Sequence, residues 1–169
     1  MIIRQENTQD YGEVYSVVRS AFAEAEHSDG TEQDLVTALR KSAAFVPELS
    51  LVAVIEGRIA GHIMFTRAEV GDKNVLALAP LSVRPGNQKK GVGTALIREG
   101  HRIARKLGYE YSVVLGSDKY YPREGYIPAK ELGIQAPFEV PSENFMALRL
   151  TEDADPVCGI LKYAPEFGI

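Results

Sequence analysis

"PLSVRPGNQKKGVGTALI", residues 80–97, leads from a short apolar stretch through two closely spaced glycines into an apolar pattern of helical spacing. Gly91 and Gly93 carry no Cβ, so the backbone there can approach a ligand closely. The first amides of the helix that follows have no partner within the helix, and the helix dipole adds partial positive charge to them. Lys89 and Lys90 bring formal positive charge to the same place. The stretch therefore predicts a turn that binds phosphate at the start of a helix.

Two common phosphate-binding motifs do not fit this stretch. A Walker loop needs a lysine directly after its second glycine, and neither Gly91 nor Gly93 is followed by one. A Rossmann fingerprint needs a third glycine where this chain has Leu96. For two glycines alone, a purely structural interpretation is also available, since small residues let a helix pack tightly on a sheet.

The rest of the chain alternates between helical and extended patterns. Apolar residues recur at helical spacing up to Phe22, with Thr8 as the expected N-cap, and a second helix is indicated from Thr31. A third helix is expected over 92–107. A short strand is expected at Ile2 and Ile3, and further strands at 49–55, 59–70, 74–83, 111–116, 137–140 and 144–150. This order predicts one α+β or α/β domain with a mixed sheet.

Pro80 lies inside the expected strand 74–83. Proline has no amide hydrogen to donate to a neighbouring strand. The strand is therefore expected to be an edge at this point or to carry a β-bulge.

Composition and charge narrow the function classes. The chain has 169 residues, 45% of them hydrophobic, which is enough for one domain with a core. With 19 Lys and Arg against 23 Asp and Glu, the net charge is −4, which argues against nucleic-acid binding. No apolar run is long enough to cross a membrane, and the first residues lack the pattern of a secretory signal. The single Cys158 and the scattered His27, His62 and His101 form no metal motif. We expect a cytoplasmic protein with no metal, no membrane and no nucleic-acid partner.

The pattern Val83-Arg84-Pro85, Gln88, Gly91, Gly93, Leu96 resembles the signature loop of the GNAT superfamily of acyl-CoA-dependent N-acetyltransferases, [QR]-x-x-G-x-[GA] after a strand ending in V-x-P. The resemblance extends over residues 1–150 and includes Y-x-x-x-G-[FY] at 121–126 and the turn at 56–62. Within the superfamily, the chain is similar to small bacterial acetyltransferases of poorly defined substrate. The resemblance implies a mixed central sheet whose strands 4 and 5 splay around acetyl-CoA, flanked by about four helices. Residues 151–169 are then a tail packed on the same domain.

The resemblance also implies a set of binding and reacting groups. Acetyl-CoA is the cosubstrate, and no metal is needed. The pantetheine arm pairs with the backbone of Leu81, Ser82 and Val83 as an added strand. The pyrophosphate lies on the backbone of the glycine loop, at Gln88, Lys89, Lys90, Gly91, Val92, Gly93 and Thr94.

A proton is needed for the departing thiolate of coenzyme A, and the family pattern assigns this step to Tyr121. An unperturbed phenol has a pKa of about 10 and is protonated at neutral pH. Tyr120 is the neighbouring competitor. The base that deprotonates the amine stays open: Glu32 is a candidate in the acceptor-binding region and His62 is another. For both, the structural interpretation is the stronger one, a capping-turn residue and a packed histidine.

The expected function is transfer of an acetyl group from acetyl-CoA to a primary amine of a small molecule or peptide, by direct attack in a ternary complex. The alternatives are an acyl-CoA-binding or sensing module without catalysis, and an acetyltransferase that modifies proteins. A homodimer is compatible with the superfamily.

Overall fold

A mixed nine-stranded sheet organises the chain, and the computed structural model describes all residues 1–169. The strands are β1 (Ile2–Gln5), β2 (Phe45–Ile55), β3 (Arg58–Val70), β4 (Lys73–Val83), β5 (Tyr111–Leu115), β6 (Ile127–Pro128), β7 (Ile134–Gln135), β8 (Phe145–Arg149) and β9 (Gly159–Lys162). Their spatial order is β1-β2-β3-β4-β5-β8-β6, and β9 pairs with both β3 and β7. Strands β1 to β4 are antiparallel neighbours, whereas β4 and β5 are parallel. The predicted α+β fold with a mixed sheet is confirmed.

Three α-helices, α1 (Tyr11–Phe22), α2 (Glu32–Arg40) and α3 (Val92–Lys106), accompany the sheet. The expectation of about four is too high, because the segment after β5 forms only the 3-10 turn η3 (Tyr121–Glu124). Pro122 lacks an amide hydrogen there, and Gly125 ends the turn with φ +96°. The first cap also differs from the expectation: Asn7, not Thr8, accepts from an amide of the first turn, and Asp10 accepts from the Asn7 amide in return.

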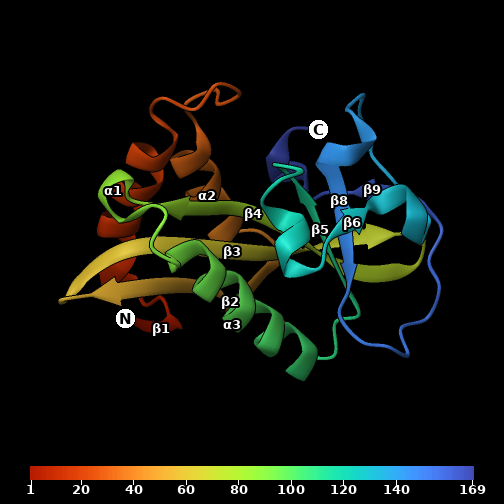
Figure 1. Cartoon of the computed structure of the whole chain (residues 1–169), viewed down its shortest axis with the longest axis horizontal. Helices are drawn as coiled ribbons and strands as arrows, with labels where there is room; N and C mark the ends of the chain where they lie inside the picture. Colours follow the sequence, from red (N-terminus) through yellow and green to blue (C-terminus); the bar gives the residue numbers. More distant parts are fainter.

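The helices cover opposite faces of the sheet. Figure 1 shows α3 (green) in front of β2 and β3, with α1 and α2 behind the strands. Successive residues of a strand point to opposite faces. Accordingly, Ile63 and Phe65 of β3 pack in the cluster that contains α3, whereas Met64 packs with α1 and α2.

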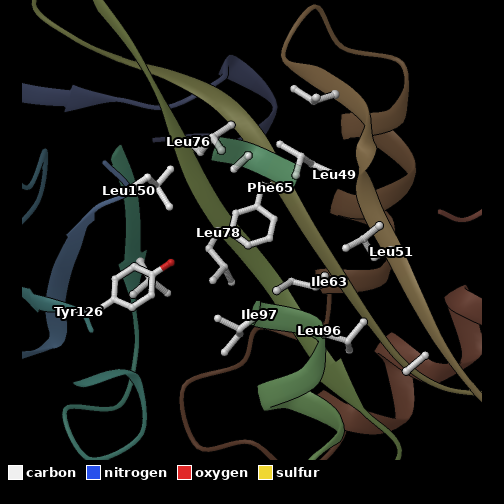
Figure 2. Close-up of a cluster of buried hydrophobic side chains, with 14 of the residues drawn as sticks. Leu49, Leu51, Ile63, Phe65, Leu76, Leu78, Leu96, Ile97, Tyr126 and Leu150 are labelled. Carbon is white, nitrogen blue, oxygen red and sulfur yellow. The ribbon is translucent and has the colours of Figure 1, made fainter. Parts of the chain in front are cut away.

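The core under α3 has Phe65 near its centre, as Figure 2 shows, with Leu78 of β4 and Ile97 of α3 close to it. Gly100 of α3 lies directly against the Phe65 ring, because a Cβ added at this glycine would be 2.3 Å from Phe65 Cε1. The helix can therefore pack closely on the sheet only because this position has no side chain.

The pairing of β4 is irregular at Pro80. Ile63 pairs with Leu81 and Phe65 pairs with Leu78, so β4 has one residue more than β3 in this interval. This is the predicted β-bulge. On its other side, β4 pairs with β5 only from Leu76 to Leu78, and beyond Leu78 the two parallel strands separate.

The end of the chain differs from the sequence-based expectation. Residues 137–140 form no strand; the segment starts at Pro137 and is followed by Pro141, and neither proline can donate to a ladder. Phe138 and Val140 nevertheless pack on the buried cluster beside β5 and β8. The segment after residue 150, expected to be a tail packed on the domain, also contains β9, in which Leu161 pairs with Val70 of β3.

Candidate active site

A cavity of about 710 Å³ lies beside the last residues of β4, beyond the point where this strand stops pairing with β5. It is bounded by the end of α1, the last residues of β4, the start of α3 and the segment around η3. Its lining consists of Ala21, Phe22, Ala25, Leu81, Val83, Asn87, Gln88, Lys89, Gly91, Val92, Gly93, Thr94, Tyr120 and Arg123. Elements that are far apart in sequence thus meet around one space at the carboxyl end of β4.

The turn between β4 and α3 is shaped for an anion. Lys89 and Gly91 have φ of +62° and +84°, in the left-handed region, so the chain folds back on itself before the helix. Gln88 Nε2 donates to the Val83 carbonyl at 3.2 Å and ties the turn to the end of the strand. No side chain caps α3. The amides of its first turn therefore remain available to a negatively charged group at the positive end of the helix.

The structure brings eight of the ten predicted cofactor residues into the cavity lining: Leu81, Val83, Gln88, Lys89, Gly91, Val92, Gly93 and Thr94. The side chain of Ser82 points to the other face of β4, as strand alternation requires, and its buried hydroxyl has no hydrogen-bond partner. Lys90 is exposed and does not line the cavity.

The two candidate tyrosines have different surroundings. Tyr120 lines the cavity, and its hydroxyl lies over the first turn of α3: a Cβ added at Gly93 would be 2.5 Å from it. Tyr121 does not line the cavity; its ring packs against Gly116 and stands edge-on to Tyr126 at 5.8 Å. Burial raises the pKa of the Tyr121 phenol above its usual value, with Tyr120 contributing in the same direction. The Tyr121 hydroxyl therefore keeps its proton throughout the physiological pH range.

A buried polar contact holds Tyr126, the residue against which the Tyr121 ring packs. The Tyr126 hydroxyl lies 2.9 Å from His101 Nε2 of α3 and 2.8 Å from Ser112 Oγ of β5. Burial, and then the charge of Arg105, lower the pKa of His101 to about 4. His101 is therefore neutral at pH 7, and it links α3 to the strand that precedes the tyrosines.

The two candidate bases lie away from the cavity lining. Glu32 accepts a hydrogen bond from Ser28 Oγ at 2.7 Å in the loop that precedes α2. His62 is completely buried, and its Nε2 lies 3.1 Å from Ser50 Oγ. Burial lowers the pKa of His62 to about 4. The charge of Glu6 raises this pKa, and the charge of Arg40 lowers it.

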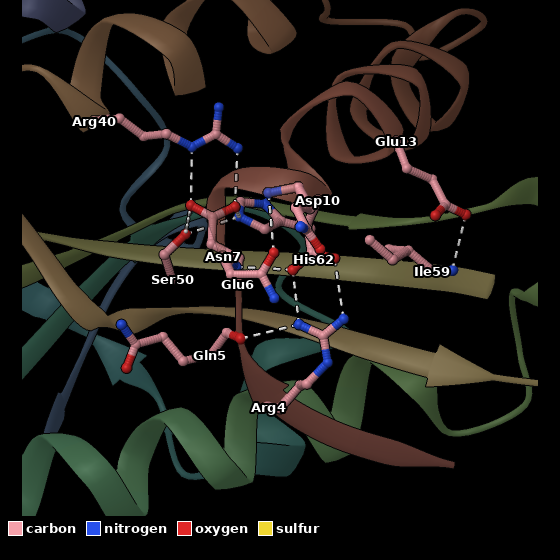
Figure 3. A network of polar contacts seen from close by, with 11 residues as sticks. Arg4, Gln5, Glu6, Asn7, Asp10, Glu13, Arg40, Ser50, Ile59 and His62 are labelled. Carbon is pink, nitrogen blue, oxygen red and sulfur yellow. Dashed lines mark hydrogen bonds and ion pairs between the residues drawn. The ribbon is translucent and has the colours of Figure 1, made fainter. Parts of the chain in front are cut away.

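Figure 3 shows the polar network that surrounds His62. Glu6 accepts two hydrogen bonds from the Arg40 guanidinium, at 2.8 and 2.9 Å, and one from Ser50 Oγ at 2.7 Å. The network therefore joins α2 and the end of β1 to the middle of the sheet. Its side chains are almost entirely buried, which identifies it as part of the scaffold.

Sequence reasoning missed several cavity residues. Arg123 lies inside the Y-x-x-x-G-[FY] stretch, so a basic residue two positions after Tyr121 was the available signal. Phe22 and Ala25, at and just after the end of α1, carry no chemical signature, and only the tertiary fold brings them to the cavity.

No helix combines the length and the apolar character that crossing a membrane requires.

Comparisons with known proteins agree with this geometry. Residues 12–126 match the acetyltransferase (GNAT) family. The chain is 43% identical over 118 residues to the uncharacterized N-acetyltransferase YjhQ of Escherichia coli, an alignment that covers 67% of this chain and 65% of that relative.

Two solved structures are similar over nearly the whole chain. The GNAT family N-acetyltransferase YhbS of Escherichia coli, in complex with CoA, is 26% identical with a TM-score of 0.90, over 99% of this chain and 92% of that one. A GNAT family acetyltransferase of Brucella melitensis, in complex with acetyl-CoA, is 33% identical with a TM-score of 0.81, over 98% and 97%. This chain belongs to the acetyltransferase (GNAT) family.

Proposed function

We propose that this protein transfers the acetyl group of acetyl-CoA to a primary amine of a small molecule or peptide, by direct attack of the amine within a ternary complex. The observation that carries the proposal is the cavity where β4 separates from β5, bounded by an anion-binding turn at the start of α3. The CoA and acetyl-CoA complexes of the two similar structures support this choice of donor.

In this mechanism, the backbone holds the donor. The amides between Gln88 and Thr94 bind the pyrophosphate at the positive end of α3. The backbone of Leu81–Val83, which pairs with β3 and has no pairing with β5, accepts the pantetheine arm along its free edge. An amide of the same segment faces the oxyanion that forms when the amine attacks the thioester carbonyl.

A tyrosine then protonates the thiolate of coenzyme A as the tetrahedral intermediate collapses. The family pattern selects Tyr121, and the position of Tyr120 in the cavity lining makes it the second candidate. A lysine-like amine in water has a pKa of about 10.4 and must lose a proton before attack. Glu32 is hydrogen-bonded by Ser28 in the loop before α2, and His62 is completely buried against Ser50, so we assign this proton to water rather than to either side chain.

The test is a thiol-release assay with acetyl-CoA and a panel of primary amines, followed by mass spectrometry of the acetylated product. For an accepted amine, Tyr121→Phe should lower kcat by about 100-fold, because a positioned acid contributes on that order. Tyr120→Phe, prepared in parallel, decides between the two tyrosines, and Tyr163→Phe outside the cavity is the control. If both tyrosine variants keep the wild-type rate at every pH, the tyrosine mechanism is wrong.

Two outcomes of the same assay would favour the alternatives. Tight acetyl-CoA binding without turnover on any amine would indicate an acyl-CoA-binding or sensing module. Turnover on lysines of intact proteins, with none on small amines, would indicate an acetyltransferase that modifies proteins.

A further inference from the structure

We infer that Arg123 is a second phosphate-binding group of the cavity, and that it binds a phosphate of the coenzyme from the segment around η3, beside the glycine loop. The inference rests on the proposed function, since it needs coenzyme A in this cavity. Lys89 and Arg123 are the only charged side chains among the lining residues, and no carboxylate is present. In a chain of net charge −4, this cavity is locally positive.

The Arg123 charge is not neutralised by the protein. The neighbouring carboxylate, Glu124, pairs with Arg98 at 2.9 Å, and no ion pair includes Arg123. Arg123 Nε donates only to the Tyr120 carbonyl, at a long 3.5 Å. The guanidinium is thus held beside the cavity with its other donors free for a ligand.

Tyr120 positions this guanidinium. The Arg123 guanidinium carbon lies 4.9 Å from the centre of the Tyr120 ring, and the hydroxyl of the same ring lies over Gly93 at the start of α3. Contact with an aromatic face orients an arginine without removing its charge. The planar fork that results suits the oxygens of a phosphate, which it can bind through two parallel hydrogen bonds.

Coenzyme A carries three phosphates, two in the pyrophosphate and one on the ribose 3′-hydroxyl. The glycine loop and Arg123 reach the cavity from different elements, so between them they can hold more phosphate charge than the loop alone. We therefore expect the selectivity for coenzyme A over its phosphate-free fragments to depend on Arg123.

The experiment measures binding by isothermal titration calorimetry, with CoA, 3′-dephospho-CoA and pantetheine as ligands. Arg123→Ala should raise the Kd for CoA by about 10- to 100-fold, the usual range for a hydrogen bond between charged groups. Arg123→Lys keeps the charge but loses the planar fork, so its Kd for CoA should lie between those of the wild type and Arg123→Ala. Arg102→Ala, which removes an exposed arginine of α3 paired with Glu99, is the matched control and should bind like the wild type.

The three ligands identify the phosphate. If Arg123→Ala weakens the binding of CoA but not of 3′-dephospho-CoA, Arg123 binds the 3′-phosphate. If it weakens the binding of both equally but not that of pantetheine, Arg123 binds the pyrophosphate. Unchanged CoA affinity in Arg123→Ala, or an equal loss with pantetheine, overturns the inference. Failure of the proposed function would look different. The wild type would bind CoA but acetylate no amine, and the effect of Arg123→Ala on CoA binding would be unchanged.

Discussion

Two walls of the cavity can be compared directly. The loop wall, residues 81–94, is one continuous segment, and we propose that its backbone amides bind the coenzyme. The tyrosine wall, residues 116–123, presents the side chains of Tyr120 and Arg123. Tyr120 packs against Gly93 and the Tyr121 ring, and Arg123 lies on the Tyr120 ring. A backbone wall depends on dihedral angles that local sequence specifies, whereas a side-chain wall depends on neighbours that are distant in sequence. The following predictions test that difference.

Gly91→Glu attacks the loop wall and should have the largest effect. Gly91 has φ +84°, a conformation that disfavours any side chain by about 1–2 kcal/mol, and the new carboxylate would face the pyrophosphate. We expect the Kd for acetyl-CoA to rise by about 100-fold or more, measured by calorimetry. Gly12→Glu is the control, because Gly12 also has open space around it and lies outside the cavity. Wild-type affinity in Gly91→Glu would refute the pyrophosphate assignment.

Gly100→Ala tests how far the loop wall depends on the close packing of α3 against Phe65 of the sheet. The added methyl group would collide with the Phe65 ring, so the helix must move or the ring must leave its rotamer. Overpacking of this kind costs about 1–3 kcal/mol, which exceeds the gain of about 1 kcal/mol in helix propensity. Urea unfolding should show a net loss of up to about 2 kcal/mol. Gly12→Ala in α1, where nothing lies nearby, should be neutral or slightly stabilising, and equal behaviour of the two variants would contradict the packing argument.

The sequence predicted the loop wall better than the tyrosine wall, and the reason is physical. Gly91, Gln88 and the helix start lie within a few residues of one another, so their spacing alone defines the turn. Pro80 likewise indicates an irregular strand, because a residue without an amide hydrogen cannot donate to a neighbouring strand. The cavity role of Arg123 depends on where α3 packs, which no local pattern records.

The errors in the fold have a similar origin. Phe138 and Val140 alternate like strand residues, but two flanking prolines exclude the ladder, and the apolar side chains are buried without it. Strand β9 is only four residues long, and its pairing with β3 is a contact over about half of the chain. Neither local propensity nor hydrophobic period separates such a strand from a packed tail.

Gly93→Ala tests the contact between the two walls. Its methyl group would lie 2.5 Å from the Tyr120 hydroxyl oxygen, so the tyrosine must shift out of place. We expect the Kd for acetyl-CoA to rise by about 10-fold, equivalent to about 1.4 kcal/mol. Adding Tyr120→Phe should recover most of this loss, because the next ring atom, Cζ, is 3.6 Å away, an ordinary contact. A double-mutant cycle measures the coupling, and additive losses would show that the walls are independent.

Acidification tests the contact between His101 and Tyr126 next to the tyrosine wall, and we expect it to change the free energy of unfolding least. The folded state lowers the pKa of His101 to about 4 from 6.5, so as the pH falls below 6.5 the unfolded chain takes up this proton first. Stability is therefore lost between about pH 6.5 and pH 4, by up to about 1.4 kcal/mol per pH unit for this residue. His62 has the same direction of shift and adds its own loss over the same window.

His101→Gln should remove the first of these two contributions. Its free energy of unfolding, measured in urea at pH 7 and at pH 5, should fall by less than that of the wild type between the two values. Carboxylates with lowered pKa, such as Asp10, lose their stabilising charge only below this interval, so they do not obscure the comparison. His27→Gln, at an exposed position, should retain the wild-type difference. If His101→Gln also retains it, then His101 does not cause the loss of stability, and its contact with Tyr126 does not exclude the proton.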